Sequence, residues 1–357
     1  MQGAVENLVE KDEVLVNIKV FLLKTPLRHL WMAYKRLCAV ERKRNRAYFD
    51  YDEERFWKYA ACNKGANEEE SLRASITVDY HVVEKGLTMP ARRLAFGKEL
   101  IRTLIGKVRR YVVHYGAPRG QVVEAVAVIK AYFSLHEHER YDFQNDPEYW
   151  NSVREFVTEF PSVESAQEMH VTRAAFYAPK DSAFSDFAKG RHCIRNYDPR
   201  VSVSMRRIES AIDLARTTPS ACNRQHSRVY CLTNKETIRL VLELQGGNRG
   251  FGHLADKVLV VVSDLRDITS RRERNDAYVN GGMFLMNLCY ALYYYEVAHC
   301  ILTWGQEPEN DRKLRKLIPL RPSEEVVALL SCGEMPAEVD VANSPRKELS
   351  EIYRVVE

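Results

Sequence analysis

The sequence predicts an α+β protein in which a mixed sheet flanked by helices is preceded by a mainly α-helical N-terminal module. Three observations predict this arrangement. Segments up to about residue 140 carry apolar residues at spacings of three and four, the period of an amphipathic helix. After about residue 187, helical segments alternate with short β-branched ones. With 357 residues, 45% of them hydrophobic, the chain is long enough to build two domains.

The N-terminal module, residues 1–140, is predicted to be a set of helices separated by turns. Turn signals occur at Thr25-Pro26, at Met89-Pro90 and at 116–118, where proline or glycine interrupts the helical pattern. Five segments show this pattern of apolar residues: 14–23, 55–62, 68–87, 96–116 and 119–138.

Residues 141–186 are predicted to connect this module to a second domain at 187–357. The connector is acidic and then irregular, and its prolines at 147, 161 and 179 disfavour long helices. In the second domain helical and β-branched segments alternate, which predicts a mixed α+β fold. The expected elements are a helix at 202–216, a strand at 228–232, a helix at 234–244, a strand at 257–262, a long helix from about Asp276 and a strand near 298–303.

The segment 283–304 is long enough to cross a bilayer, and Glu296 is its only formal charge. A buried helix of a soluble domain fits the segment better. Asn287, Glu296 and His299 fall within it, and three tyrosines lie at its middle rather than at its ends. We therefore expect a helix that is buried inside a large domain or between subunits.

Charge and cysteine content narrow the class of protein. The 53 basic residues nearly balance the 49 acidic ones, and a net charge of +4 gives no general attraction to nucleic acid. The eight cysteines form no CxxC pair and no metal-finger spacing. No cleavable signal is recognisable at the N-terminus, so the pattern predicts free thiols in a reducing compartment, and we expect a cytoplasmic protein.

Basic runs at 42–46 and 102–110, beside the apolar segment 14–23, suit contact with an anionic membrane surface. A solvated charged face beside a core helix explains them more simply, because the net charge of the first 180 residues is only slightly positive. Membrane-surface contact is therefore the less favoured interpretation.

Two stretches of the N-terminal module have the residue types of a metal site: His81 with Glu84, and residues 136–139. A carboxylate-bridged site in a helix bundle needs matching Glu and Glu-x-x-His contributions from four helices, and these are not evident in the sequence. We therefore expect no metal and predict that His81 and Glu84 cap or cross-link helices.

Three separated segments have the composition needed to hold a phosphorylated, planar cofactor. Residues 191–197 place two guanidinium groups four positions apart just before a helix. Residues 218–225 pack a hydroxyl, two amides and a stiffening proline between a helix and a strand. Arg346-Lys347 places adjacent basic residues near the C-terminus. Taken singly, each segment is more often a solvated loop, turn or tail than a cofactor site.

The order and spacing of these segments resembles the nitroreductase family over roughly residues 187–357. The family's R-x-S-x-[RK] loop is matched by Arg191-His192-Cys193-Ile194-Arg195, and its P-S-x-x-N-x-Q loop by residues 219–225. The resemblance continues through the apolar helix at 280–296 and a P-x-x-E-x-x-x-L-L-x-x-G segment at 322–333. It ends at the basic pair Arg346-Lys347.

This resemblance implies an FMN-binding domain within an intertwined homodimer that has two flavin sites at its subunit interface. Arg191 and Arg195 would bind the phosphate or the pyrimidine edge of the flavin, and Arg346 would bind the phosphate. Cys193 stands where the family has serine, so a hydroxyl donor is replaced by a thiol that bonds weakly.

The remaining flavin contacts implied by the resemblance come from two loops. Pro219, Ser220 and Asn223 would reach the flavin of the partner subunit, with Gln225 nearby. Asn248, in the glycine-rich loop 246–252, is the candidate for a further amide contact.

The reaction implied by the resemblance carries electrons from NAD(P)H through FMN to an unidentified oxidised small molecule. No residue pattern supports a general acid or base, so the catalytic residues stay unassigned. The alternative is a binding or scaffold subunit with the same fold and weak or lost flavin binding. Three departures from the family pattern favour it: Cys193 for serine, Ser227 for tryptophan and Ser344 for a basic residue.

The stretch 81–87, with Pro90 and residues 96–97, resembles an N-terminal extension of nitroreductase-like proteins from bacterial polysaccharide gene clusters. This second resemblance implies a bacterial, cytoplasmic protein and a sugar-related acceptor.

Overall fold

The computed structural model describes residues 28–62, 68–166 and 169–356, in two compact units divided after Gly65. In the first unit, helix α2 spans Arg28–Tyr59 and includes most of the predicted helix at 55–62. Arg42, Lys43 and Arg46 of the basic run are exposed on it. The predicted helix at 14–23, and with it the apolar part of the membrane-surface interpretation, lies outside the described residues.

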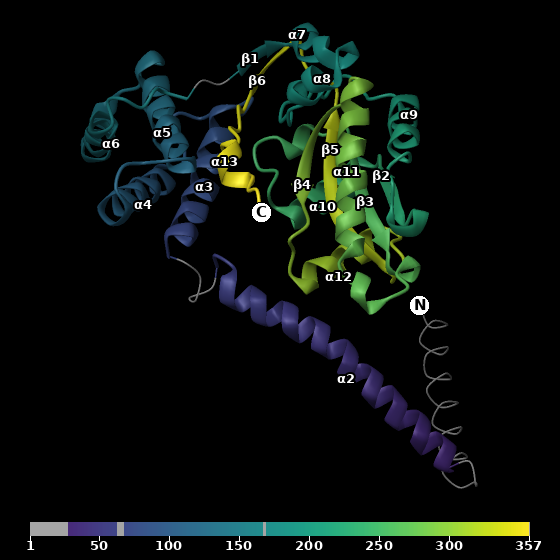
Figure 1. Cartoon of the computed structure of the whole chain (residues 1–357). Helices are drawn as coiled ribbons and strands as arrows, with labels where there is room; N and C mark the ends of the chain where they lie inside the picture. Colours follow the sequence, from purple (N-terminus) through teal and green to yellow (C-terminus); the bar gives the residue numbers. More distant parts are fainter. Residues whose placement is uncertain (1–27, 63–67, 167–168, 357) are drawn as a thin grey trace. The chain divides into compact units, whose positions relative to one another are not determined.

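Four helices at the start of the second unit pack around one apolar core (Figure 1). They are α3 (Glu68–Leu87), α4 (Lys98–Tyr115), α5 (Gln121–His138) and α6 (Pro147–Glu159). The first three confirm the helices predicted at 68–87, 96–116 and 119–138. Their apolar residues recur every three or four positions and so form a stripe along one face of each helix, which is buried in the core. On α4 this stripe includes Ile101, Leu104, Ile105 and Val108.

Helix α6 lies within the stretch that the sequence predicted to be an irregular connector. Pro147 occupies the first turn, where the missing N–H costs nothing, and Asp146 accepts a hydrogen bond from the N–H of Tyr149 at 3.4 Å. The proline therefore begins a helix here rather than preventing one. Trp150 and Phe156 of α6 are fully buried in the helical core.

The chain continues with short elements: β1 (Met169–Thr172), α7 (Arg173–Tyr177) and α8 (Phe184–Gly190). Strand β1 pairs antiparallel with β6 (Glu338–Val341), so the two ends of the sheet domain are joined. The boundaries drawn from the sequence at 1–140, 141–186 and 187–357 stay a proposal.

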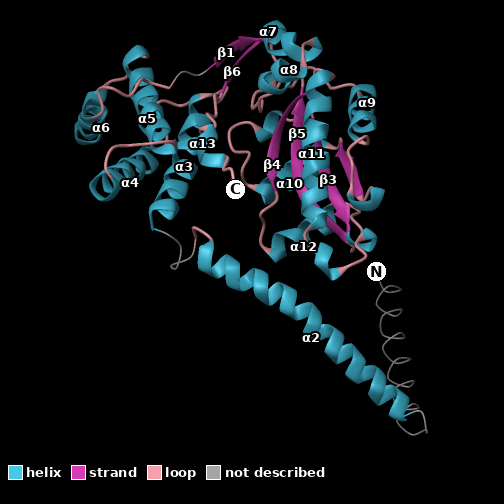
Figure 2. Ribbon diagram, viewed as in Figure 1, coloured by secondary structure: helices cyan, strands magenta, loops and turns pink. Residues whose placement is uncertain are grey.

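A four-stranded antiparallel sheet forms the centre of the remaining chain (Figure 2). Its order is β2-β3-β5-β4, with β2 at Ser227–Leu232, β3 at Lys257–Asp264, β4 at Ala298–Thr303 and β5 at Glu324–Gly333. Every residue of β3 is buried, which explains its continuous apolar run. The three strands predicted at 228–232, 257–262 and 298–303 are confirmed.

Helices cover both faces of this sheet, as expected for an α+β fold. Val258 and Val260 of β3 face a core shared with α10 (Lys235–Gln245) and α12 (Pro308–Leu317). Leu259 and Val261 face a second core shared with α9 (Met205–Ala215) and α11 (Asp276–Tyr294). The period of two along the strand therefore divides the buried residues between two layers of helices.

The apolar segment 283–304 forms two elements rather than one helix. Helix α11 ends at Tyr294, Glu296 takes a left-handed conformation with φ 55°, and β4 begins at Ala298. None of the helices in the described part of the chain is both long and apolar enough to span a membrane. The last element is the short helix α13 (Leu349–Ile352).

Candidate functional site

The loop 191–195 runs from the end of α8 along the edge of the sheet. Strand β4 is an edge strand, and the backbone N–H of Ile194 donates to the carbonyl of His299 at 2.9 Å. Ile194 is buried and anchors the loop, and Arg195 is only 9% exposed. The hydrogen bond of Ile194 to the sheet edge thus holds its neighbours Cys193 and Arg195 in place.

Four cations gather around this loop: Arg191, Arg195, Arg346 and Lys85 of α3. Burial lowers the pKa of Lys85, and the charge of nearby Arg195 lowers it further. The pKa of His192 is lowered by burial and then by the charges of Arg191 and Arg346. Groups that affect one another's ionisation in this way lie close together, so residues distant in sequence meet here.

None of these four cations forms an ion pair with another residue of the described chain. Arg191 reaches only the Cys193 sulfur, at 3.9 Å, and Arg346 donates to the backbone carbonyl of Ser344. Arg346 is exposed, and Arg195 interacts electrostatically with the Glu84 carboxylate, whereas Arg191 and Lys85 are half-buried with no carboxylate bonded to them. Desolvation of such cations is costly where no anion offsets it. The cluster is therefore suited to an anionic ligand.

Glu84 of α3 fastens the C-terminal segment to this cluster. One carboxylate oxygen accepts a hydrogen bond from the backbone N–H of Ser344 at 2.6 Å, and the other lies 2.9 Å from His81 Nδ1. Burial raises the pKa of Glu84, but these two hydrogen bonds outweigh it, and the pKa lies below its ordinary value. Figure 1 shows the C-terminal segment beside α3.

This contact corrects one prediction. His81 and Glu84 were expected to cap or cross-link helices, whereas Glu84 links α3 to the segment that carries Arg346. Sequence reasoning also missed Lys85 altogether, since a lysine in the last turn of a helix is ordinarily explained by the helix dipole.

Two buried polar atoms beside the cluster have no hydrogen-bond partner: Arg191 Nε and His299 Nε2. Burial lowers the pKa of His299 to about 4, so this ring is neutral at pH 7. Cys193 lies against the same groups. A hydrogen bond with Cys300 and the charges of Arg195 and Arg191 lower the pKa of the Cys193 thiol, despite its burial. Position 193 is therefore more polar than an ordinary buried cysteine.

The predicted loop 219–225 lies elsewhere in the chain. It is held on α11, where the N–H of Ala221 donates to Asn280 Oδ1 at 3.0 Å. With Asn280 and Phe284, residues Pro219, Ser220 and Gln225 line a cavity of about 170 Å³, to which none of the four clustered cations contributes. One copy of the chain thus brings together Arg191, Cys193, Arg195 and Arg346, but not this loop.

The backbone of the loop 219–225 is strained. Cys222, Asn223 and Gln225 all have positive φ, between 50° and 53°, which costs on the order of 1 kcal/mol or more for each non-glycine residue. Hydrogen bonds within the loop hold this shape: Ser220 Oγ accepts from the N–H of Gln225 at 2.9 Å, and Gln225 Nε2 donates to Asn223 Oδ1 at 3.0 Å. Such over-determined strain is typical of functional loops.

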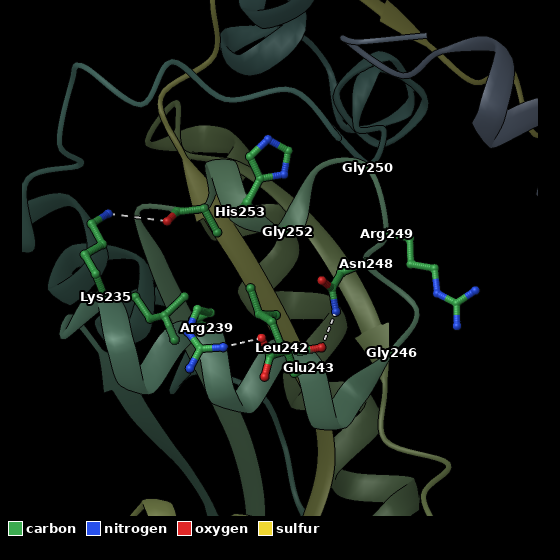
Figure 3. A pocket seen from close by; sticks show the side chains of 12 residues that line it. Lys235, Arg239, Leu242, Glu243, Gly246, Asn248, Arg249, Gly250, Gly252 and His253 are labelled. Atoms are coloured by element: carbon green, nitrogen blue, oxygen red, sulfur yellow. Dashed lines mark hydrogen bonds and ion pairs between the residues drawn. The ribbon is translucent and has the colours of Figure 1, made fainter. Parts of the chain in front are cut away.

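Asn248 has its amide turned back onto the end of helix α10. Its Nδ2 donates to the carbonyl of Leu242 at 2.6 Å and to Gln245 Oε1 at 3.0 Å, and Figure 3 shows the first of these bonds. The side chain thereby stabilises the turn that follows α10.

The residues considered for a metal site have other partners. His136 is buried, with Nδ1 2.7 Å from the carbonyl of Tyr132 and Nε2 accepting from the N–H of Ala95 at 2.7 Å. Within the described ranges, no group of three or more His, Cys, Asp or Glu residues is arranged to hold a metal ion.

Comparison with known proteins identifies relatives of the sheet domain. Residues 188–334 match the model of the nitroreductase family. A Bacillus subtilis (strain 168) protein named "Putative NAD(P)H nitroreductase YdgI" is 30% identical over 88 residues, which are 25% of this chain and 42% of that protein. The match therefore spans less than half the length of this relative.

Solved structures also resemble this chain over about half of its length. A nitroreductase-like protein from Streptococcus mutans is 18% identical, and the match covers 49% of this chain and 98% of that one with a TM-score of 0.42. A protein from Exiguobacterium sibiricum 255-15, crystallised in complex with FMN, is 17% identical, with coverages of 49% and 98% and a TM-score of 0.42. Residues 188–334 are therefore similar to the nitroreductase family.

Proposed function

We propose that the sheet domain binds FMN and transfers electrons from NAD(P)H to an oxidised small molecule. The observation that carries this proposal is the cluster of unpaired cations formed by Arg191, Arg195, Arg346 and Lys85. A phosphate group supplies two negative charges and several acceptor oxygens, which is what such a cluster lacks.

The residues of the cluster fit the groups of FMN. Arg191 Nε is a buried donor without a partner, and a phosphate oxygen would satisfy it. Arg346 extends from the C-terminal segment beside the same loop and would hold the phosphate from a second direction. Arg195, almost buried beside β4, would donate to the pyrimidine edge.

The second half of the site is proposed to come from a second copy of the chain. Pro219, Ser220 and Gln225 line a cavity separate from the cation cluster, and Asn223 is bonded to Gln225, so we infer that in one chain these residues do not reach the same ligand. In a homodimer these residues would contact the flavin held by the partner. Asn248 is the weakest of the proposed contacts, because its amide already donates to Leu242 and Gln245 of α10.

Bound FMN would supply the hydride chemistry, by accepting a hydride from NAD(P)H and passing electrons to the acceptor. The arginines of this chain would orient it and neutralise its phosphate. NAD(P)H and the acceptor would each be positioned in turn against the flavin ring, and this positioning needs no side chain that acts as a general acid or base. The cytoplasmic setting and a sugar-related acceptor stay predictions from the sequence.

A second candidate function is a binding or scaffold subunit that has weak or no flavin affinity. Two observations favour it. The Cys193 thiol is engaged by Cys300 instead of presenting a hydroxyl donor, and the Gln225 amide is bonded within its own loop. Both changes remove donors that a flavin would otherwise use.

The absorbance spectrum of the purified protein distinguishes the two candidates. The enzyme is expected to retain FMN, or take it up when added, and to show a flavin band that NADH or NADPH bleaches. A protein that stays colourless after incubation with excess FMN and gel filtration would reject the oxidoreductase and leave the scaffold subunit.

A further inference from the structure

A cavity of about 580 Å³ lies between the C-terminal end of α3 and the glycine-rich loop that follows α10. Val82, Lys85 and Met89 line it on the α3 side, Arg93 and Phe96 line it from the turn before α4, and Arg249 lines it from the glycine-rich loop. Arg191 and Arg346 of the cation cluster do not border it.

The charges around this cavity are all of one sign. Its charged lining residues are Lys85, Arg92, Arg93 and Arg249, and no aspartate or glutamate lines it. Arg92 donates to the carbonyl of Leu87 at 2.5 Å. The side chains of Lys85, Arg93 and Arg249 have no hydrogen bond or ion pair with any described residue.

The neighbouring cavity, on the other side of the same loop, provides the comparison. There the cations of α10 are neutralised: Lys235 lies 2.9 Å from Asp256, and Arg239 is paired with Glu236 and Glu243. Figure 3 shows Arg249 extending away from Lys235 and Arg239. Arg249 borders both cavities, so the two differ in their other cations: those of α10 are paired, whereas Lys85 and Arg93 beside α3 are not.

Two glycines let the walls of the cavity approach each other. At Gly250, where φ is +87°, an added Cβ would lie 3.1 Å from Met89 Sδ, and at Gly86 it would lie 2.3 Å from a ring carbon of Phe96. A side chain at either position would force the walls apart. Phe96, Met89 and Val82 form the apolar part of the lining, and the cations form the charged part.

We propose that this cavity binds a small organic anion whose phosphate or carboxylate group contacts Lys85, Arg93 and Arg249 and whose apolar body lies on Phe96 and Met89. Three cations without counter-charges, one of them half-buried, are stabilised by such a group through charge-assisted hydrogen bonds. The apolar wall adds affinity for an aromatic or aliphatic body. The site shares Lys85 with the cation cluster, but Arg93 and Arg249 lie outside that cluster, so excess FMN in the test separates this site from the proposed flavin site.

Isothermal titration calorimetry of the full-length protein, with excess FMN present, tests this proposal. Phenyl phosphate and benzoate are the probes, one for each anionic group, and inorganic phosphate measures the contribution of the apolar wall. We expect one site per chain for at least one of the two organic probes, with binding tighter than that of inorganic phosphate and weakened by added salt. The double variant Arg93→Gln/Arg249→Gln is expected to weaken binding about tenfold or more.

Two matched variants locate the site. Arg239→Gln removes a paired arginine of the neighbouring cavity, and Arg346→Gln removes a cation of the proposed flavin site; neither is expected to change the affinity for the probe by more than about twofold. Far-ultraviolet circular dichroism checks that each variant is folded. The proposal is overturned if neither organic probe binds, if Arg239→Gln weakens binding as much as the double variant does, or if only Arg346→Gln abolishes it.

Discussion

Cations of the helical core form ion pairs with carboxylates, whereas those of the cation cluster do not. Helix α3 belongs to both regions. Along its first part, α3 offers Glu69 and Asp79 to cations of the helical core: Arg119 lies 2.8 Å from Glu69, and Lys107 lies 2.6 Å from Asp79. At its end, Lys85 has no such partner and lies near Arg195. Paired cations serve the packing of helices, whereas unpaired cations indicate where a ligand is expected.

The largest expected effect is in the packed region. Trp150→Ala removes a fully buried indole that stacks on Tyr132 with ring centroids 5.8 Å apart, and it should lower the free energy of unfolding by about 3–5 kcal/mol. Urea denaturation followed by circular dichroism measures this change. Val113→Ala, at a residue 80% exposed, should change stability by less than about 0.5 kcal/mol. Equal effects of the two substitutions would contradict the assigned core.

Arg191→Gln tests the opposite region. Loss of one charge-assisted contact should weaken FMN binding by roughly tenfold to a hundredfold, measured by flavin absorbance after gel filtration or by fluorescence titration. Because Arg191 is half-buried without a carboxylate partner, its removal should not lower the free energy of unfolding in the absence of flavin.

Arg200→Gln is the matched control for Arg191→Gln, since Arg200 is exposed and paired with Asp198 at 2.8 Å. Flavin content that does not change in the Arg191 variant would refute the placement of the phosphate site. If Arg200→Gln loses as much flavin as Arg191→Gln does, the loss comes from the lower net charge of the protein and not from a specific contact.

The smallest expected effect concerns the link between the two regions. The hydrogen bonds of Glu84 lower its pKa in the folded protein, so the carboxylate adds stability above the ordinary glutamate pKa of about 4.3, and this stability is lost as the pH falls. Glu84→Gln should therefore cost about 1–2 kcal/mol at pH 7 and less near pH 3. Denaturation curves at the two pH values measure it.

Glu137→Gln, at an exposed glutamate near the end of α5, is the control for this pH dependence. Its cost should be close to zero at both pH values. A Glu84 variant whose cost is the same at pH 7 and pH 3 would argue against an ionised Glu84 as the anchor of the C-terminal segment.

Much of the fold could be predicted because its signals are local. The helix period of 68–87 and the β-branched run of 257–262 depend only on neighbouring residues, and both elements form as expected. Pro147 was misleading because a proline disrupts a helix interior but is tolerated in its first turn. The segment 283–304 was divided by a left-handed turn at Glu296 that apolar content does not reveal.

The candidate site was predictable only in part. Arg191, Cys193, Arg195 and Arg346 were visible as members of ordered segments, and the structure brings them together. Lys85 was not visible, because its importance arises from the packing of α3 against the sheet domain, a contact between residues far apart in sequence. The pattern of a single sequence shows how residues are spaced along the chain, but it does not show which helices and strands contact one another in the folded protein.

The position of β5 in the sheet has a consequence for synthesis. It pairs with both β3 and β4, yet it is the last of the four strands along the chain. While the chain emerges from the ribosome, β2 and β3 are free to pair with each other, but β4 has no neighbour in this sheet until residues 324–333 have been made. The sheet therefore closes late, whereas all four helices of the N-terminal core leave the ribosome early and are free to pack before the sheet exists.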